Sequence, residues 1–411
     1  MLTLLYSPTN FASQKGNPQS EDCLKLNVWS KATGSTRKPV LIWFHGGRMV
    51  TLDSLGLALI SDIPMFVGFI GGSTNNPFYQ GQYMTDKEDV IIVTVNYRLN
   101  IFGFAGAPGL PQNVGLLDQR LAVEWVRDNI AAFGGDPDRI TIFGHSAGGV
   151  AVDYYTYAWK QDPIVSGVIS MAGTALSMAP NTPAESTKYW NAAVTALGCQ
   201  DSSDTVACVR SKPFSELSAA VLKVPPEPSK ALPQPVFHPT IDEKVVFSNY
   251  EELSARGEFA RVPYLVGSGD YEAGYYKVSA HGAGKRLTDD QWNKFNLAAF
   301  TCSSARAAHN RATHGVPVWR YRYFGQWPNT ALYPGSGAYH GTDVAQVFGT
   351  AADASGAPNT DAENQVSSLM SHAWAAFAAN PASGLSELGW PQYSSSGESK
   401  PHEHAPRCCD V

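Results

Sequence analysis

Short, nearly continuous apolar runs alternate along this chain with longer segments whose apolar residues recur at helical spacing. Six runs have the length of strands: residues 40–44, 90–95, 139–143, 165–171, 262–266 and 318–324. Three segments have helical periodicity: residues 115–133, 147–159 and 362–379. Uninterrupted apolar, β-branched runs are typical of strands that are covered on both faces. The alternation therefore predicts an α/β fold, with a mostly parallel sheet and helices on both faces.

Composition supports one large buried sheet. Charged residues make up 16% of the 411 residues and hydrophobic residues 44%, whereas about a quarter of an average soluble protein is charged. The proline-dense segment 225–239 is interpreted as an extended surface connection and not as a domain boundary. There is no internal repeat and no low-complexity segment. We expect a single domain over residues 1–411.

Charge and hydropathy exclude several classes of partner. The net charge is −6 and no run of Lys or Arg occurs, so nucleic acid and anionic membranes are not expected to bind. No apolar stretch approaches the roughly 20 residues of a membrane helix. The apolar start, residues 1–6, has no basic region and no clear cleavage site, so no signal peptide is predicted. The oligomeric state is not determined by these features.

The six cysteines are too sparse for a disulfide scaffold, and no CxxC pair indicates zinc. Cys199 and Cys208 flank a short polar stretch; spacing alone leaves open whether they form a local disulfide or stay two buried thiols. Residues 402–409 contain histidines and cysteines, but their spacing matches no familiar metal site. We therefore expect no metal and no cofactor.

A candidate nucleophile lies between a predicted strand and a predicted helix. Gly144-His145-Ser146-Ala147-Gly148 fits the G-x-S-x-G pattern of a sharp strand-to-helix turn. Such a turn needs small residues two positions either side of the serine, and the two glycines meet that need. The following helix N-terminus favours negative charge that develops near Ser146.

In a fold of this kind the acid and then the base follow the nucleophile along the chain. His340 stands in a loop of small residues, 335–343, and is the best candidate for the base. Asp270 and Glu272 follow the predicted strand 262–266, where parallel sheets place functional groups. Spacing does not separate these two candidate acids.

Several blocks together resemble the type-B carboxylesterase/lipase family, which includes the cholinesterases: residues 20–29, 95–99, 115–119, 133–137, 339–343 and the 144–148 turn. The resemblance covers about residues 20–393. It implies an α/β-hydrolase fold, a small-molecule ester substrate and extracellular location for the intact family member. It also implies a triad of Ser146, Glu272 and His340, a Cys199–Cys208 disulfide and an ion pair between Arg98 and Asp118.

The chain departs from the family pattern in three places. His145 precedes the nucleophile, where the family usually has Glu or Gln. Several tens of family residues that precede the position of Cys23 have no counterpart, so we expect a truncated N-terminal region and an unpaired Cys23. Residues 398–411 do not resemble the family's C-terminal region.

The family's oxyanion turn, His-Gly-Gly-Gly, is interrupted. His45-Gly46-Gly47 is followed by residues 48–67, and only then by Gly68. Deletion of 48–67 would join Gly47 to Gly68 and restore the turn, whose amides bind the oxyanion together with that of Ala147. We interpret 48–67 as a retained intron of about 60 nucleotides, at three per residue, or a gene-model error; the alternative is a natural lid.

Two functions follow from the sequence. The first is a carboxylic ester hydrolase that forms an acyl-enzyme. We expect the interrupted oxyanion turn to impair its activity. The second is an inactive, cholinesterase-like binding or adhesion module. The complete set of Ser146, Glu272 and His340 favours the hydrolase.

Overall fold

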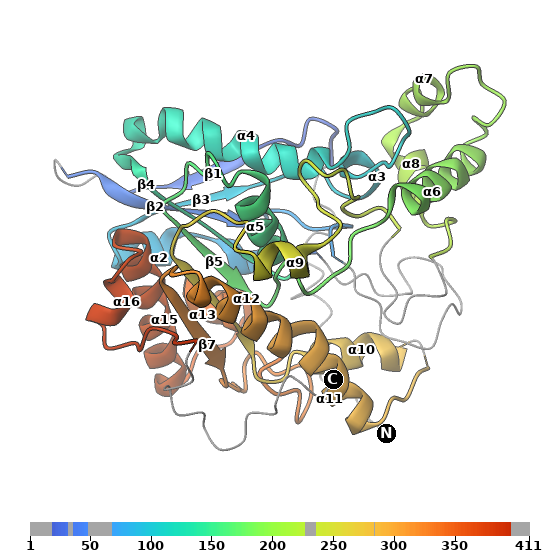
Figure 1. Cartoon of the computed structure of the whole chain (residues 1–411). Helices are drawn as coiled ribbons and strands as arrows, with labels where there is room; N and C mark the ends of the chain where they lie inside the picture. Colours follow the sequence, from blue (N-terminus) through green and yellow to red (C-terminus); the bar gives the residue numbers. More distant parts are fainter. Residues whose placement is uncertain (1–18, 32–35, 48–67, 227–235, 283, 396–411) are drawn as a thin grey trace.

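A seven-stranded sheet runs through the centre of the computed structural model, which describes residues 19–31, 36–47, 68–226, 236–282 and 284–395 (Figure 1). Its strand order is β1-β3-β2-β4-β5-β6-β7, and only β1 is antiparallel to its neighbour. The strands are β1 (Leu26–Trp29), β2 (Lys38–Phe44), β3 (Ile91–Val95), β4 (Gly135–His145), β5 (Gly167–Met171), β6 (Tyr264–Gly269) and β7 (Val318–Tyr323).

Helices cover both faces of this sheet. The helices and helical turns are η1 (Pro77–Tyr79), α2 (Gln82–Lys87), α3 (Asn100–Gly103), α4 (Val114–Asn129), η2 (Ile130–Phe133), α5 (Ala147–Ala158), α6 (Pro183–Ala196), α7 (Thr205–Arg210), α8 (Phe214–Val221), α9 (Tyr250–Ala255), α10 (Ala273–Gly282), α11 (Asp289–Asn296), η3 (Leu297–Thr301), α12 (Cys302–Thr313), α13 (Thr342–Phe348), α14 (Ala351–Ser355), α15 (Asp361–Ala379) and α16 (Gly384–Glu387).

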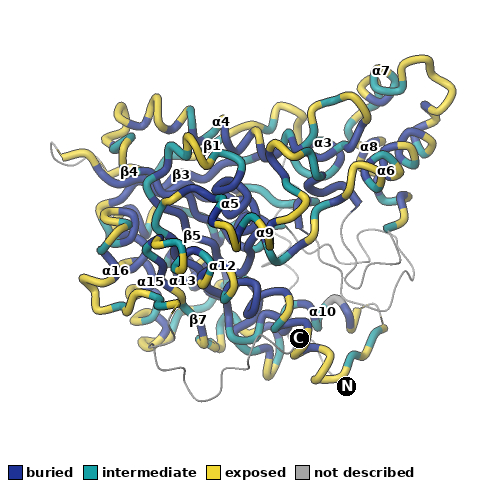
Figure 2. Tube along the Cα trace, viewed as in Figure 1, coloured by how far each residue is buried: buried dark blue, intermediate teal, exposed yellow. Residues whose placement is uncertain are grey.

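Strand β2 shows why its sequence lacks polar positions. Val40 and Ile42 pack into a core shared with α4, α5, α9 and α12, whereas Leu41 and Trp43 pack into a core shared with α13 and α15. Successive side chains of a strand point to opposite faces, so a strand with helices on both sides must be apolar throughout. Figure 2 shows the strands as the buried centre and the outer helix surfaces as exposed.

The predicted α/β-hydrolase architecture is confirmed, and each of the six predicted strands is present. Strand β4 begins four residues earlier and ends two residues later than predicted, and the others differ by at most three residues at either end. The predicted helix 115–133 consists of α4 followed by the turn η2. Strand β1 was not predicted, because it has only four residues and lies at the edge of the sheet. The number of domains stays a prediction.

The predicted disulfide between Cys199 and Cys208 is confirmed. It belongs to an outlying group of three helices, α6, α7 and α8, which projects at the upper right of Figure 1 and has its own apolar cluster. In the described part of the chain Cys23 carries a free thiol. No helix among the described residues is both long and apolar enough to cross a membrane.

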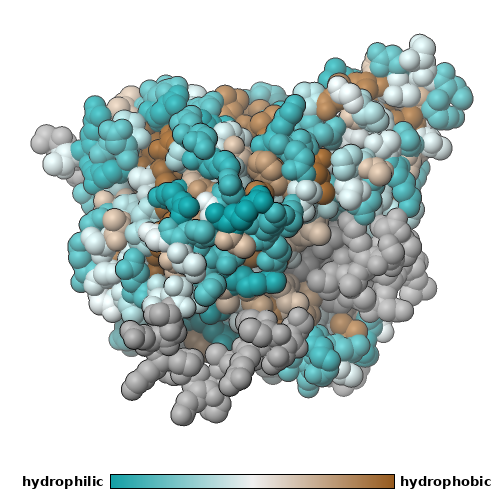
Figure 3. Space-filling view, in the orientation of Figure 1, coloured by the Kyte–Doolittle hydropathy of each residue, from teal (hydrophilic) through white to brown (hydrophobic). Residues whose placement is uncertain are grey.

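The face seen in Figure 3 is mostly hydrophilic, with apolar side chains in several separate places. Several predictions concern residues that the structure does not describe: residues 1–6, 48–67 and 398–411, the last of which include His402 and the later histidine and cysteines. So does most of the proline-dense connection.

Candidate active site

Ser146 joins β4 to α5 in the sharp turn that the sequence predicts. Its backbone has φ 58° and ψ −122°, a region that L-residues rarely adopt. The surrounding chain holds this conformation, because the Ser146 amide donates to the Met171 carbonyl over 2.8 Å. A Cβ added to Gly148 would lie 1.9 Å from the Phe44 carbonyl oxygen, and one on Gly144 would lie 2.5 Å from the Gly148 carbonyl carbon. Both glycines are therefore required by close backbone contact.

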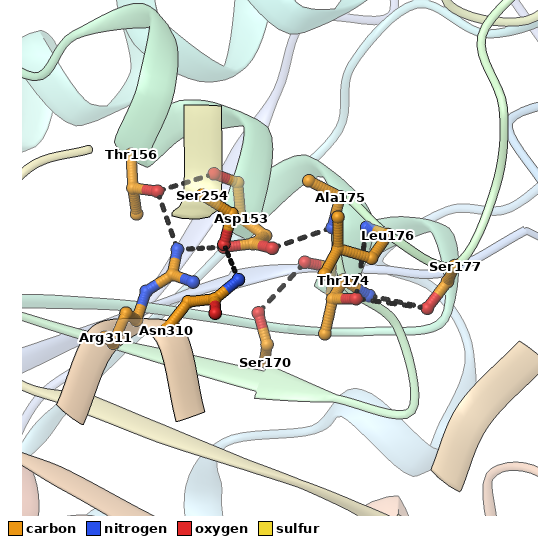
Figure 4. A network of polar contacts seen from close by, with 11 residues as sticks. Asp153, Thr156, Ser170, Thr174, Ala175, Leu176, Ser177, Ser254, Asn310 and Arg311 are labelled. Carbon is orange, nitrogen blue, oxygen red and sulfur yellow. Dashed lines mark hydrogen bonds and ion pairs between the residues drawn. The ribbon is translucent and has the colours of Figure 1, made fainter. Parts of the chain in front are cut away.

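A buried polar network fixes α5 behind this turn (Figure 4). One carboxylate oxygen of Asp153, on α5, accepts a 2.7 Å hydrogen bond from the Ala175 amide, and the other contacts the Arg311 guanidinium from α12. Ser170 on β5 donates to the Gly149 carbonyl over 3.1 Å. The helix that begins at the nucleophile is thus held by three separate segments.

His340 and Glu272 are brought together from the loops after β7 and β6. The Nδ1 atom of His340 contacts Oε2 of Glu272, while Oε1 of Glu272 accepts a hydrogen bond from the Gly269 amide. Both side chains are buried. Burial raises the pKa of Glu272, with the Gly269 hydrogen bond acting in the opposite sense, and burial lowers the pKa of His340.

Asp270, the other candidate acid, points elsewhere. Its carboxylate lies 2.5 Å from the Arg322 guanidinium, and both side chains are about one-third exposed. The structure therefore places Glu272, and not Asp270, on the imidazole.

Tyr276 connects the nucleophile to the imidazole. Burial raises the pKa of Tyr276 and the nearby Ser146 side chain acts in the opposite sense, and the Tyr276 ring lies 5.3 Å from the His340 ring, centroid to centroid. Phe300 and Tyr275 lie 5.1 and 6.1 Å from the same imidazole. Phe300 comes from η3, a π-helical turn, and such turns recur at functional sites. An aromatic wall therefore stands beside the candidate nucleophile.

The chain on both sides of residues 48–67 approaches the nucleophile turn. A Cβ on Gly46 would lie 3.1 Å from the Ser146 Cβ, and one on Gly68 would lie 3.2 Å from the Ala147 Cβ. Gly47 follows Gly46 directly. The predicted oxyanion donors are thus close to the nucleophile in sequence or in space, but the segment between them lies outside the described residues, so its interpretation stays a prediction.

Sequence reasoning assigned no role to three residues that the structure adds to this region. One is Tyr276. Another is His145, whose ring lies 4.3 Å from that of His340. The third is Asp343, which accepts a 2.9 Å hydrogen bond from the Tyr321 hydroxyl; burial and the nearby Glu272 raise the pKa of Asp343 to about 7. The sequence offered one signal for two of them: His145 lies in the nucleophile turn, and Asp343 lies in the loop that contains His340.

The Arg98 and Asp118 side chains form the ion pair that the resemblance implies. Asp118 accepts hydrogen bonds from Nε and a terminal nitrogen of Arg98 over 2.8 and 2.7 Å, and from the Arg98 amide over 3.0 Å. This bidentate pair joins the segment after β3 to α4. Its place in the structure is architectural.

Comparisons with known proteins identify a family and several relatives of similar sequence. Residues 5–296 and 275–405 match the sequence profile described as "Carboxylesterase family", a wider span than residues 20–393. The chain is 34% identical to Secreted lipase 5 of Gibberella zeae over 92% of this chain and 71% of the relative. It is 33% identical to Chlorogenic acid esterase of Aspergillus niger, over 89% and 67%. It is 27% identical to Para-nitrobenzyl esterase of Bacillus subtilis, over 91% and 77%.

Proposed function

This chain belongs to the carboxylesterase family, and on that premise we propose that it hydrolyses carboxylic esters with Ser146 as nucleophile, His340 as general base and Glu272 as the carboxylate that orients the imidazole. The observation that carries the proposal is the contact between His340 Nδ1 and Glu272 beside a serine held at positive φ. A binding module has no need for that strained turn, so the arrangement favours catalysis over the inactive alternative.

The proposed reaction has two stages. The lone pair of His340 Nε2 takes the Ser146 proton as Oγ attacks the ester carbonyl, and the same proton then goes to the leaving alcohol. Water, deprotonated by the imidazole in the same way, attacks the acyl carbonyl, and the proton then goes from the imidazolium to Ser146 Oγ as the acid leaves. Glu272 accepts from Nδ1–H throughout, so it fixes the tautomer and stabilises the transient imidazolium.

The tetrahedral oxyanion is proposed to bind the amides of Ala147, Gly47 and Gly68. Ala147 is the first residue of α5, where the helix N-terminus adds favourable partial charge. Each such donor contributes about 10²–10³ in rate in a characterised serine hydrolase. The aromatic wall of Tyr276 and Phe300 favours an ester with an apolar group next to the carbonyl.

Two relatives are named as a secreted lipase and an esterase of chlorogenic acid. By analogy we propose a small-molecule carboxylic ester as substrate and an extracellular place of action. The Cys199–Cys208 disulfide supports that location, because disulfides persist in oxidising compartments. We also propose that residues 1–411 form one domain around the seven-stranded sheet.

The test uses Ser146→Ala and a matched control, Ser166→Ala. Ser166 precedes β5, and the one hydrogen bond of its hydroxyl to the described residues goes to the Ile140 carbonyl, so its removal should leave p-nitrophenyl ester hydrolysis intact. Ser146→Ala should abolish hydrolysis and labelling by a fluorophosphonate. Labelling that persists in folded Ser146→Ala would refute the nucleophile; folded wild type with neither hydrolysis nor labelling would support the inactive module.

A further inference from the structure

Three side chains with metal-binding atoms converge at the candidate active site. His145, Glu272 and His340 each offer one ligand atom, and these atoms all lie within 4.8 Å of one another. The three come from the end of β4 and from the loops after β6 and β7. All are more than nine-tenths buried. No other group of three such residues was found among the residues that the structure describes.

His145 is the member that the ester chemistry leaves unused. Its Nε2 atom is buried and has no hydrogen-bond partner within the described part of the chain. An unsatisfied buried polar group costs about 1–3 kcal/mol. Space adjoins the ring, since an added Cβ on Gly341 would lie 3.5 Å from Cε1 and 4.0 Å from Nε2. An unpaired imidazole nitrogen beside a second imidazole and a carboxylate indicates a ligand.

We propose that His145, Glu272 and His340 bind a Zn²⁺ ion that reversibly inhibits the enzyme. This inference rests on the proposed function, because two of the three residues belong to the proposed triad. Two imidazoles and one carboxylate are a donor set that zinc prefers, with water as fourth ligand. Mg²⁺ and Ca²⁺ prefer oxygen ligands instead. Both histidines are buried, and the neutral imidazole is the form that binds metal.

The geometry requires only side-chain adjustment. Bonds of about 2.0–2.2 Å to a tetrahedral zinc place ligand atoms roughly 3.3–3.6 Å apart. In the structure the three ligand atoms lie within 4.8 Å of one another, a limit that exceeds that spacing by little more than 1 Å. In the proposed complex, rotations of the three side chains supply this difference.

Inhibition follows from the tautomer of His340. In the proposed resting enzyme the ring proton is on Nδ1, facing Glu272, and the Nε2 lone pair receives the Ser146 proton. Coordination through Nδ1 moves that proton to Nε2, so no lone pair is left for the serine. Coordination through Nε2 uses the lone pair directly. In either case the imidazole cannot act as base, and no redox change is involved.

The binding test is calorimetric titration of untagged, EDTA-treated protein with Zn²⁺. Wild type should bind one equivalent at this site, and His145→Gln should lose at least tenfold in affinity. His372→Gln is a matched control, because it removes a His–Glu contact of 2.8 Å from an exposed position. A second control replaces His402 and His404, which stand in the tail. Equal affinity in wild type and folded His145→Gln would overturn the proposal.

A second measurement needs only wild type. Saturating Zn²⁺ should block fluorophosphonate labelling of Ser146, EDTA should restore it, and the same concentration of Mg²⁺ should have no effect. Unchanged labelling at full zinc occupancy would place the ion elsewhere. Calorimetry does not depend on turnover, so an inactive protein that binds zinc through His145 would refute the proposed function alone. An active enzyme without His145-dependent binding would refute the zinc site alone.

Discussion

Arg311 and Asp153 form an ion pair in the core, with 1% and 0% of their side chains exposed (Figure 4). Arg311 comes from α12 and Asp153 from α5, the helix that begins at the candidate nucleophile. The guanidinium also lies 4.0 Å from the centre of the Tyr264 ring on β6. The pair therefore connects the nucleophile helix to the strand that leads toward the proposed acid.

Loss of either charge should destabilise the fold strongly. Asp153→Asn or Arg311→Met leaves a buried charge without its partner, which costs about 3–5 kcal/mol. The control is Arg256→Met, whose contact with Glu252 is more than half exposed and contributes about 0–1 kcal/mol. Urea unfolding followed by circular dichroism measures the free energy. A loss for Asp153→Asn no larger than that for Arg256→Met would show that the buried pair is not needed.

We expect the Tyr276 phenol, which lies near Ser146, to restrain the nucleophile by accepting a hydrogen bond from its hydroxyl. The phenol competes with His340 for the serine hydroxyl, and a neutral hydrogen bond contributes about 0.5–1.5 kcal/mol. Tyr276→Phe should therefore raise the rate of fluorophosphonate labelling about two- to tenfold. Tyr275→Phe, one residue earlier on α10, is the control. Slower labelling in Tyr276→Phe would indicate that the phenol assists the reaction.

Local patterns were enough to predict the strands and the nucleophile turn, because buried parallel strands and close backbone contacts restrict residue types at fixed spacing. Spacing was not enough to choose the acid. Asp270 and Glu272 are two residues apart, yet the first pairs with Arg322 and the second with His340. That choice depends on how β6 and β7 align, and the resemblance supplied it.

Contacts across long sequence separations had no local signature. Asp153 and Arg311 are 158 residues apart. The apolar periodicity of their two helices does not indicate that either residue has a partner. Nothing in the local sequence distinguishes Tyr276 from other aromatic residues on a buried helix face. Its contact with Ser146 arises only when α10 packs over the nucleophile turn.

Buried His45 should make stability depend on pH. Burial lowers the pKa of His45 to about 4, although its hydrogen bond to the Gly46 carbonyl acts in the opposite sense; the unfolded value is near 6.5. Between pH 6.5 and 4, His45 therefore binds a proton in the unfolded chain but stays neutral in the folded chain. This contribution is fully present above pH 6.5 and declines by about 1.4 kcal/mol per pH unit below it.

The comparison of wild type with His45→Gln isolates this term from the buried carboxyls, which titrate in the same range. Urea titrations between pH 4 and 6.5 give the slope of unfolding free energy against pH. This slope should be smaller in the variant, by an amount that corresponds to at most one bound proton. Parallel curves for the two proteins would show that His45 is protonated in the folded state.

Excision of residues 48–67 should raise esterase activity if that segment is foreign to the fold. The described chain on either side meets the nucleophile turn, at Gly46 against Ser146 and at Gly68 against Ala147. Joining Gly47 to Gly68 restores consecutive glycine amides, and each oxyanion donor recovered corresponds to about 10²–10³ in kcat. Hydrolysis of p-nitrophenyl acetate by the excised and full-length proteins measures the change, with Ser146→Ala in the excised protein as background control. A transcript that lacks about 60 nucleotides, three for each of the twenty residues, would give independent support. Equal or lower activity after excision, with both proteins folded by circular dichroism, would show that residues 48–67 are a working part of the enzyme.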